Sequence, residues 1–534
     1  MVELQKNKKI LIFDITPIHN MNTRIAALFF LITFHTSAQD SLVYFSDLKF
    51  QSGFELESFK KYNQPGLEPV FNLMMADGKL LNETEVERHR VSFFKTLDEL
   101  KSKLADKSES KKAKSFATTI KEKYMLQYSE ETDFESVFAA GRYNELTATM
   151  LYALGLEYLN IPYQIVLEPG NFLVVAYPST NPLRIDSAPS SVAVTTISNE
   201  YMNQYVAMLR NQKIISEKEY KSKSLKELFD EYYFGKVGQI KLENLISIYY
   251  LHIADNFLKD DKHLLAFEAS EKALYINANA RATYYATNLV ADAFLSIKEK
   301  NLKQAELLGK YTRYKPQGYS DDVALGEFVQ AGEKLLVSEG KKEAFRIYYE
   351  KVLAYTFQPV LNQKITTYYY TLLGNYFSKQ GSYDSSFVQF DKAISINKED
   401  QNLHLDFIRC LYLLGEQGYG SKSFQDKVMT SRLKHPQLAK FRQFQQLAGS
   451  VLLAQVTYAF QSNKPQVGEK LLTQFEQDKE LHVTQPSMIS SVYSLVAVFY
   501  FQKNQTQKAK EILNRGLLIV PDNFELKQRK KMIN

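Results

Sequence analysis

Residues 370–394 read YTLLGNYFSKQGSYDSSFVQFDKAI, and this stretch carries the pattern that decides the fold. Apolar residues recur at helical spacing before Gly381 and again after it, and a glycine in that place is typical of a helix end. Small residues on each face let the two helices approach closely, while large residues fill the gap. The stretch therefore predicts an antiparallel helix pair. The residues predicted to pack in it are Tyr370, Leu373, Gly374, Phe377, Ser386, Phe390 and Ala393.

The same order of small and large residues recurs over residues 245–525. Its clearest second copy runs from Ser490 to Asn523, and further copies complete a series. The predicted units start at residues 247, 286, 325, 367, 401, 449 and 490, so neighbouring starts lie 39, 39, 42, 34, 48 and 41 residues apart. A recurring order at this spacing indicates a repeat array, which we expect to hold about seven helix pairs. A non-repetitive helical bundle is the alternative.

This pattern resembles the tetratricopeptide repeat, a helix–turn–helix unit of about 34 residues. The resemblance implies an all-α superhelix with a concave face, lined by the first helix of each unit, that binds a peptide or a partner protein. Solvated helix positions with no such role are the alternative reading of each exposed polar residue. The residues that the resemblance implies for the binding groove are Asp255, Lys259, Glu333, Asn375, Lys379 and Gln502.

The segment before the array, residues 39–240, has a mixed pattern, and residues 128–186 are its informative part. Apolar residues at helical spacing predict a helix over 145–159, which Asn160-Ile161-Pro162 breaks. Short β-type runs separated by turn residues then predict strands at 163–167, at 172–177 and from residue 183. We therefore expect an α+β domain here, followed by the all-α array.

A helix followed by antiparallel strands in this order resembles the transglutaminase-like, or papain-like, fold. The residues that carry the resemblance are the turn Gly141–Asn144, the helical run 147–152, the phrase Asn160-Ile161-Pro162 and the strand before Tyr177-Pro178. The resemblance implies a cysteine opening the helix, a histidine at the start of the following strand and an acid on the next strand. This layout would lower the thiol pKa at a helix N-terminus and supply a base for its proton.

The sequence departs from that family at two of the three positions. Glu145 stands where the cysteine is expected and Asn171 where the histidine is expected, whereas Asp186 keeps a suitable type. The single cysteine of the chain is Cys410, which we expect to fill space on a buried helix, and no histidine occurs between residues 89 and 252. We therefore predict a pseudoenzyme with no catalytic residues, no metal and no cofactor.

Two alternatives to this non-catalytic interaction scaffold stay open. The first is a hydrolase in which Glu145 and Asp186 act as a carboxylate pair with water, which requires the two groups to face each other in one open pocket. The second is a purely structural spacer within an envelope assembly. A spacer would capture no partner that depends on the concave face of the array.

The N-terminus carries the features of an export signal. Arg24 precedes the ten-residue apolar run Ile25–Phe34, and Thr36-Ser37-Ala38 supplies small residues before Gln39. We expect residues 1–38 to be a signal peptide, with residues 1–20 a doubtful upstream extension of a chain that starts at Met21. A signal peptide would make the mature protein periplasmic or extracellular. The alternative is that the apolar run forms a short buried helix of the fold. Ten apolar residues are fewer than the ~20 needed to span a bilayer.

Composition excludes several classes of protein. Of the 534 residues, 45% are hydrophobic and 24% are charged, which is ordinary for a globular chain and argues against integral membrane spans. A net charge of +6 at this length gives no reason to expect a nucleic-acid partner. We read the lysine-rich stretch Lys101–Lys123 as the solvated face of a helix, and residues 526–534 as a solvated basic tail. The oligomeric state stays open.

Overall fold

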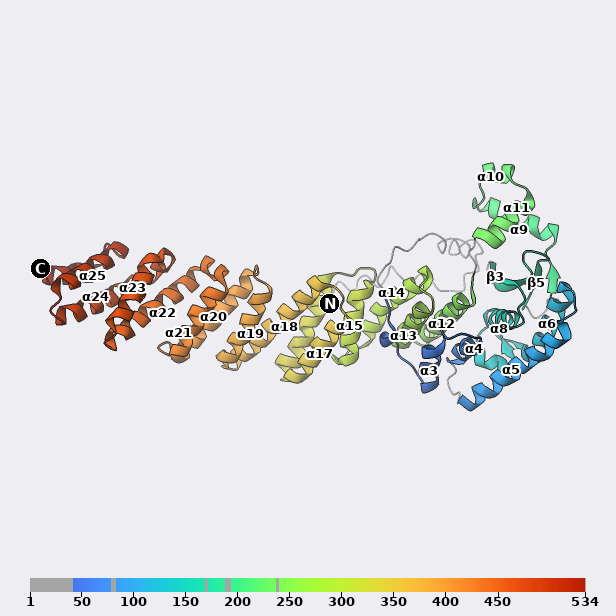
Figure 1. Ribbon diagram of the computed structural model, residues 1–534, viewed down its shortest axis with the longest axis horizontal. Helices are drawn as coiled ribbons and strands as arrows, with labels where there is room; N and C mark the ends of the chain where they lie inside the picture. The colour runs from blue at the N-terminus through green and yellow to red at the C-terminus, as the bar shows by residue number, and fades with distance from the viewer. Residues whose placement is uncertain (1–41, 78–82, 169–170, 188–193, 237–239, 534) are drawn as a thin grey trace. The chain divides into compact units, whose positions relative to one another are not determined.

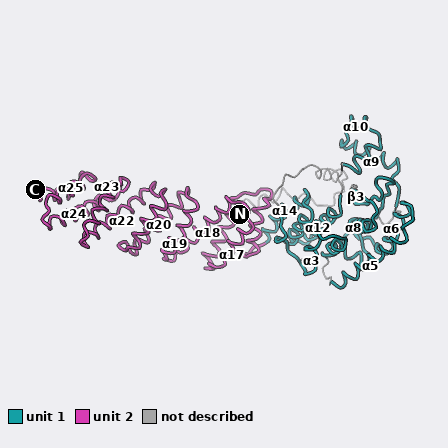
Figure 2. Tube along the Cα trace, in the orientation of Figure 1, with its two compact units in different colours: residues 1–296 teal, residues 297–534 magenta. Residues whose placement is uncertain are grey.

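The structure is a computed structural model, and the chain divides into two compact units, residues 1–296 and 297–534 (Figure 2). The predicted signal peptide at residues 1–38, with its doubtful extension 1–20, lies outside the residues that the structure describes. The predicted domain boundary near residue 240 falls inside the first unit. The described residues are 42–77, 83–168, 171–187, 194–236 and 240–533.

The first unit begins with helices joined by aromatic packing. Phe71 lies 5.9 Å from Phe93 and 5.2 Å from Phe138 between ring centroids, in stacked and edge-on arrangements that aromatic rings favour. The lysine-rich stretch forms parts of two helices, which residues 105–108 separate. The elements are η2 (Phe45–Asp47), α3 (Gly53–Lys61), α4 (Glu68–Met75), α5 (Glu83–Leu104), α6 (Glu109–Tyr124) and α7 (Phe134–Ala139).

A four-stranded antiparallel sheet follows α8 (Glu145–Tyr158); the sequence predicts its first three strands and not the fourth. Val166, Leu173 and Val175 point from one face into a cluster formed with α9, α11 and η3. Because successive side chains in a strand alternate in direction, the neighbouring residues face the other side, where α8 packs. The sheet is therefore covered on both faces. Its strands pair in the order β3 (Tyr163–Glu168), β4 (Asn171–Ala176), β5 (Leu183–Ile185) and β6 (Val194–Thr196).

Tyrosine and phenylalanine side chains pack together in the helical layer that covers the sheet on the face opposite α8. The rings of Phe229 and Tyr233 stack at 4.5 Å, and Tyr205 meets Tyr233 edge-on at 5.1 Å. These large rings pack over Val166, Leu173 and Val175 of the sheet, and the guanidinium of Arg184 lies 4.9 Å from the centroid of the Tyr201 ring. The elements of this layer are α9 (Asn199–Asn211), α10 (Glu217–Ser222), α11 (Leu225–Phe229) and η3 (Asp230–Lys236).

Three helices of the predicted array belong to the first unit: α12 (Leu242–Lys259), α13 (His263–Ile276) and α14 (Ala280–Ser296). Lys272 of α13 forms a buried ion pair with Glu55 of α3 at 2.6 Å. The Tyr249 hydroxyl of α12 accepts a hydrogen bond from the backbone N–H of Phe134 at 2.8 Å. The first helix pair is therefore packed into the α+β part.

The second unit consists of helices in antiparallel succession, which Figure 1 shows from α15 to α25. The predicted repeat of helices is confirmed over this unit. The elements are α15 (Leu302–Tyr314), α16 (Asp321–Gly332), η4 (Glu333–Ser338), α17 (Lys342–Tyr355), α18 (Pro359–Lys379), α19 (Tyr383–Ile396), α20 (Gln401–Gly418), α21 (Lys422–Lys434), η5 (Pro436–Lys440), α22 (Arg442–Gln461), α23 (Pro465–Gln477), η6 (Lys479–Val483), α24 (Pro486–Gln502), α25 (Thr506–Ile519) and α26 (Phe524–Met532).

The pair α18–α19 shows why small residues are needed. A methyl group placed on Gly374 would lie 3.0 Å from the ring of Phe390, so the phenylalanine fills the space that the glycine leaves. Ser386, also on the packed face, donates its hydroxyl to the carbonyl of Gly374 at 2.8 Å. The small–large order read from the sequence therefore corresponds to close helix contact.

Two parts of the array differ from the sequence expectation. The unit expected from residue 286 spans the division between the two units, since α14 packs against α13 and α15 packs against α17. Most of the expected basic tail at 526–534 is the helix α26, because Leu526 is buried and the helix packs against α24 and α25. The lysines of this helix lie on its other sides.

The approach of α15 to α17 leads to a stability prediction. A methyl group on Gly309 would lie 2.6 Å from Cβ of Tyr355 and 2.7 Å from the carbonyl oxygen of Val352, and neither atom can rotate away. We expect Gly309→Ala to destabilise the second unit by about 1–3 kcal/mol in urea unfolding followed by circular dichroism. Gly326 in α16 has no atom within 4 Å of such a methyl group. The control Gly326→Ala should therefore stabilise by about 0.5–1 kcal/mol, and equal shifts for both variants would contradict the packing argument.

Candidate functional site

Glu145 is the first residue of α8, and the helix begins there because Asn144 caps it. The backbone N–H of Thr147 donates to Oδ1 of Asn144 at 2.9 Å, and the N–H of Asn144 donates to the Thr147 hydroxyl at 3.0 Å. This reciprocal cap satisfies two backbone donors that a helix start otherwise leaves unpaired. It fixes the helix N-terminus at the position where the resemblance places a cysteine.

The Glu145 carboxylate has a specific partner that the sequence did not indicate. The Tyr128 hydroxyl donates to Oε1 of Glu145 at 2.6 Å. Tyr128 is placed by a two-residue parallel pairing of β1 (Gln127–Tyr128) with β2 (Arg142–Tyr143), in which it lies opposite Tyr143. Burial raises the pKa of Tyr128 well above its usual range, and the hydrogen bond to Glu145 raises it further. The phenol is therefore a neutral donor that holds the carboxylate in place.

The start of β4 is tied to the same part of α8. The Thr149 hydroxyl, one helical turn after Glu145, donates to the carbonyl of Phe172 at 2.9 Å. Asn171 precedes Phe172 and opens β4 opposite Glu168 of β3. The backbone of Asn171 therefore lies at a strand start beside the first turns of α8. The Asn171 side chain lies outside the described side chains.

Asp186 follows directly after β5, the strand that pairs with β4. One of its carboxylate oxygens lies 4.0 Å from a guanidinium nitrogen of Arg184. Tyr152 lies two helical turns after Glu145. Burial is the largest cause that raises the pKa of Tyr152, and the charges of Tyr143 and Asp186 raise it further. The structure therefore places the three sequence-predicted positions on three elements that pack together. Tyr128 and Tyr152 are members of this neighbourhood that sequence reasoning missed.

The chemistry available at this helix tip differs from thiol chemistry. The sulfur of Cys410 lies in the second unit, where burial raises the pKa of its thiol to about 11 and Ser386 lies 3.4 Å away. In the first unit, burial lowers the pKa of the His89 imidazole. Within the residues that the structure describes, no group of three or more His, Cys, Asp or Glu side chains is arranged to hold a metal ion.

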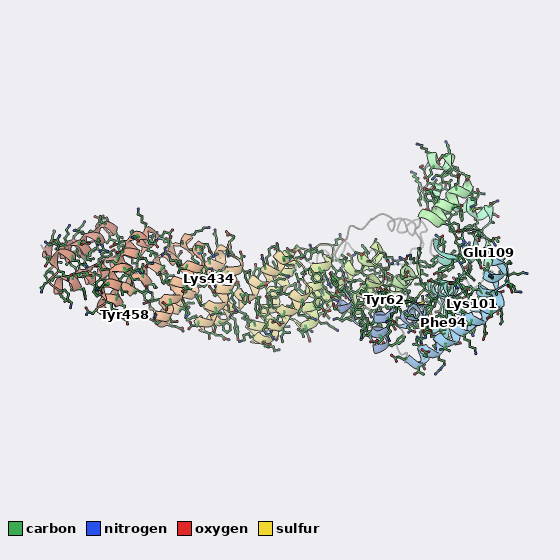
Figure 3. The ribbon with its side chains drawn as sticks, in the orientation of Figure 1. Tyr62, Phe94, Lys101, Glu109, Lys434 and Tyr458 are labelled. Carbon is green, nitrogen blue, oxygen red and sulfur yellow. The ribbon has the colours of Figure 1, made fainter. Side chains whose placement is uncertain are left out.

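A large cleft of about 1530 Å³ lies at the opposite end of α8. Glu157, Tyr158 and Asn160 contribute to its wall, so it begins about eighteen ångströms along the helix axis from Glu145, at ~1.5 Å per residue. Neither Glu145 nor Asp186 lines it. Figure 3 labels Tyr62 and Phe94, two further wall residues. The carboxylate pair of the hydrolase hypothesis thus does not face into this cleft.

The residues expected in a partner-binding groove fall into two groups. Asp255 and Lys259 lie on α12 in the first unit and have partners within the chain: Asp255 accepts from the Tyr285 hydroxyl at 3.3 Å, and Lys259 pairs with Glu131 at 3.0 Å. Burial raises the pKa of Asp255. The residues of the second unit are exposed on their helices: Glu333, Asn375, Lys379 and Gln502.

None of the helices that the structure describes combines the length and the apolar character needed to cross a membrane.

No family model matches the chain, and no curated protein matches it. Solved structures do match, among them the crystal structure of the APC/C hetero-tetramer Cut9-Hcn1, with 12% sequence identity over 90% of this chain and 99% of that chain, at a TM-score of 0.17. This TM-score is too low to support an argument. The succession of antiparallel helix pairs is by itself the architecture of a helical repeat.

Proposed function

We propose that this protein is an exported, non-catalytic scaffold that binds a peptide or a partner protein along its helix pairs. The observation that carries the proposal is the succession of antiparallel helix pairs in the second unit. Such pairs bury one face against their neighbours and leave a continuous surface of first helices for binding. Asn375 and Lys379, exposed one turn apart on α18, are the contact residues that we place at its centre.

The first unit completes the proposal as a transglutaminase-like domain that has lost its reaction. Its support is the order of α8 and the antiparallel strands, together with a carboxylate at the helix start that a tyrosine holds by a hydrogen bond. Export is proposed from the signal-like pattern at residues 21–38. A carboxylate in a first helical turn is favoured by the helix dipole by about 0.3–1 kcal/mol, so Glu145 stabilises the position without supplying a nucleophile.

Partner capture tests the binding role. We expect Asn375→Ala/Lys379→Ala to lose most of the captured partner when the exported chain is cross-linked and recovered, because both contacts on one helix are removed. The matched control is Lys422→Ala/Asp426→Ala, which changes two exposed residues one turn apart on α21, the second helix of its pair. Capture of nothing would favour a spacer, and equal capture by all three proteins would mean that the contact does not lie at Asn375 and Lys379.

Turnover assays test the loss of catalysis. On peptide amide, ester and transamidation substrates, we expect the unchanged protein to show no rate above that of Glu145→Ala. Tyr128→Phe keeps the ring and removes the donor to Glu145, so it serves as a second comparison. A reproducible rate that Glu145→Ala abolishes would establish the hydrolase instead.

A further inference from the structure

The cleft at the end of α8 has a lining that combines an apolar floor with a charged rim. Leu73, Leu242 and Ile246 are buried at its floor, with exposed fractions of 1%, 6% and 2%. Its volume of about 1530 Å³ exceeds the ~300–1,000 Å³ of pockets that enclose small molecules. The cleft therefore has room for a segment of polypeptide.

The rim is acidic, although the whole chain has a net charge of +6. Two lysines line the cleft, and one of them, Lys226, already pairs with Asp230 at 2.5 Å. A local field opposite in sign to the net charge attracts a cationic ligand at this place rather than over the surface as a whole. The lining carboxylates are Glu68, Asp98, Glu157, Asp230 and Glu243.

Hydrogen bonds orient aromatic rings between these carboxylates. The Tyr158 hydroxyl donates to Asp98 at 2.6 Å, and the Tyr163 hydroxyl donates to Glu157 at 2.7 Å. The bond to Asp98, with burial, raises the pKa of Tyr158 to about 12, so the phenol stays neutral near neutral pH. Glu243 is exposed, and its charge acts on Tyr163. Each ring thus has carboxylates beside it.

The chain itself shows how a cation is accommodated here. The ammonium of Lys101 lies 5.6 Å from the centroid of the Tyr158 ring, within the range of a cation–π contact, and Phe94 packs against the same ring at 5.1 Å. Lysine and arginine side chains combine an apolar stem with a cationic head. Such a side chain can place its stem along the apolar floor and its head at the carboxylate rim.

We propose that this cleft binds an extended, lysine- or arginine-rich segment of a partner protein. The inference rests on the proposed function, since it names the chemistry of a partner, and it adds a contact in the first unit to the one proposed on α18. Glu157 and Glu243 bind the cationic heads, and Tyr62, Tyr158 and Tyr163 contact the stems. A neutral oligosaccharide could also stack on tyrosine rings, but it would not use the negative charge of the rim.

Fluorescence anisotropy with a labelled peptide of alternating lysine and glycine tests the proposal on the full chain. We expect saturable binding that Glu157→Gln/Glu243→Gln weakens about tenfold at low salt, because each exposed carboxylate contributes up to about a fivefold change in affinity. Glutamine at 157 can still accept from Tyr163, so the wall keeps its shape. Binding should weaken as salt rises, and a glutamate–glycine peptide should not bind.

The matched control is Glu122→Gln/Glu200→Gln, which removes two exposed carboxylates that do not line the cleft. It should retain the affinity of the unchanged protein. An equal loss in both double variants would overturn the proposal in favour of unspecific charge attraction, and preferential binding of a neutral oligosaccharide would overturn it in favour of a sugar site. Absence of peptide binding would refute the proposal for the cleft and would leave partner capture through α18 untouched. The two proposals can therefore be tested separately.

Discussion

Replacing Lys272 with methionine is expected to destabilise the first unit by about 3–5 kcal/mol. The ammonium of Lys272 and the Glu55 carboxylate are 2.6 Å apart, and their side chains are only 5% and 3% exposed. Glu55 also accepts from the backbone N–H of Gln51 at 2.6 Å, so its charge is fixed at this place. Methionine removes the cation and leaves a buried carboxylate without its charge partner, which costs far more than the pair itself contributes.

Urea unfolding followed by circular dichroism measures this effect, and a double variant tests its cause. Glu55→Gln/Lys272→Met removes both charges and should recover most of the stability that Lys272→Met loses. The control Lys60→Met breaks an exposed pair with Glu57 on the same helix, α3, and should leave the urea midpoint almost unchanged. If the double variant were no more stable than Lys272→Met, lost packing rather than an uncompensated charge would be the cause.

This ion pair also shows what the sequence could not predict. The two residues are 217 positions apart on separate helices, and α13 is buried around most of its circumference. The helix pairs, by contrast, are predictable because their contacts are local: Gly374 and Ser386 are twelve residues apart and touch. The change of pattern indicated a boundary near residue 240, which falls inside the first unit, because the docking of α3 on α13 depends on a contact that no periodicity records.

The candidate site also has parts that the sequence could predict and parts that it could not. Glu145 and Asp186 could be placed from the order of one helix and its strands, because neighbouring elements in the chain are adjacent in the sheet. The donor Tyr128 could not, since a two-residue strand leaves no recognisable pattern. The cleft could not either, because its wall combines side chains from α4, α5, α8, β3 and α12. Only the packed structure brings them to one opening.

A buried carboxyl in the first unit gives the strongest pH dependence that we expect. Asp77 follows α4, and its Oδ1 atom is buried without a hydrogen-bond partner among the described residues, although the Tyr249 hydroxyl donates to its other oxygen. Burial raises the pKa of Asp77 to about 8, the charges of Asp133 and Glu55 add to the rise, and the bond from Tyr249 opposes it. The folded protein therefore holds a neutral carboxyl at pH values where the unfolded chain is ionised.

The sign of the effect follows from proton binding. Between the unfolded pKa, near 3.8, and the folded pKa, about 8, the folded state binds the extra proton, so stability is greatest below this range and falls as the pH rises through it. We expect the unchanged protein to lose several kcal/mol relative to Asp77→Asn across this range, at up to about 1.4 kcal/mol per pH unit. Asparagine keeps an acceptor for Tyr249 and does not titrate.

Urea midpoints of both proteins at pH 5, 6, 7 and 8 test this expectation, with the exposed Asp106→Asn as a control that should show no such trend. Because the chain has two compact units, the transition of the first unit must be followed separately. A stability difference between Asp77→Asn and the unchanged protein that stays constant from pH 5 to pH 8 would mean that Asp77 is ionised in the folded protein. The buried oxygen would then have to reach water or a cation, which is the opposite of the packing that places Asp77 against Tyr249.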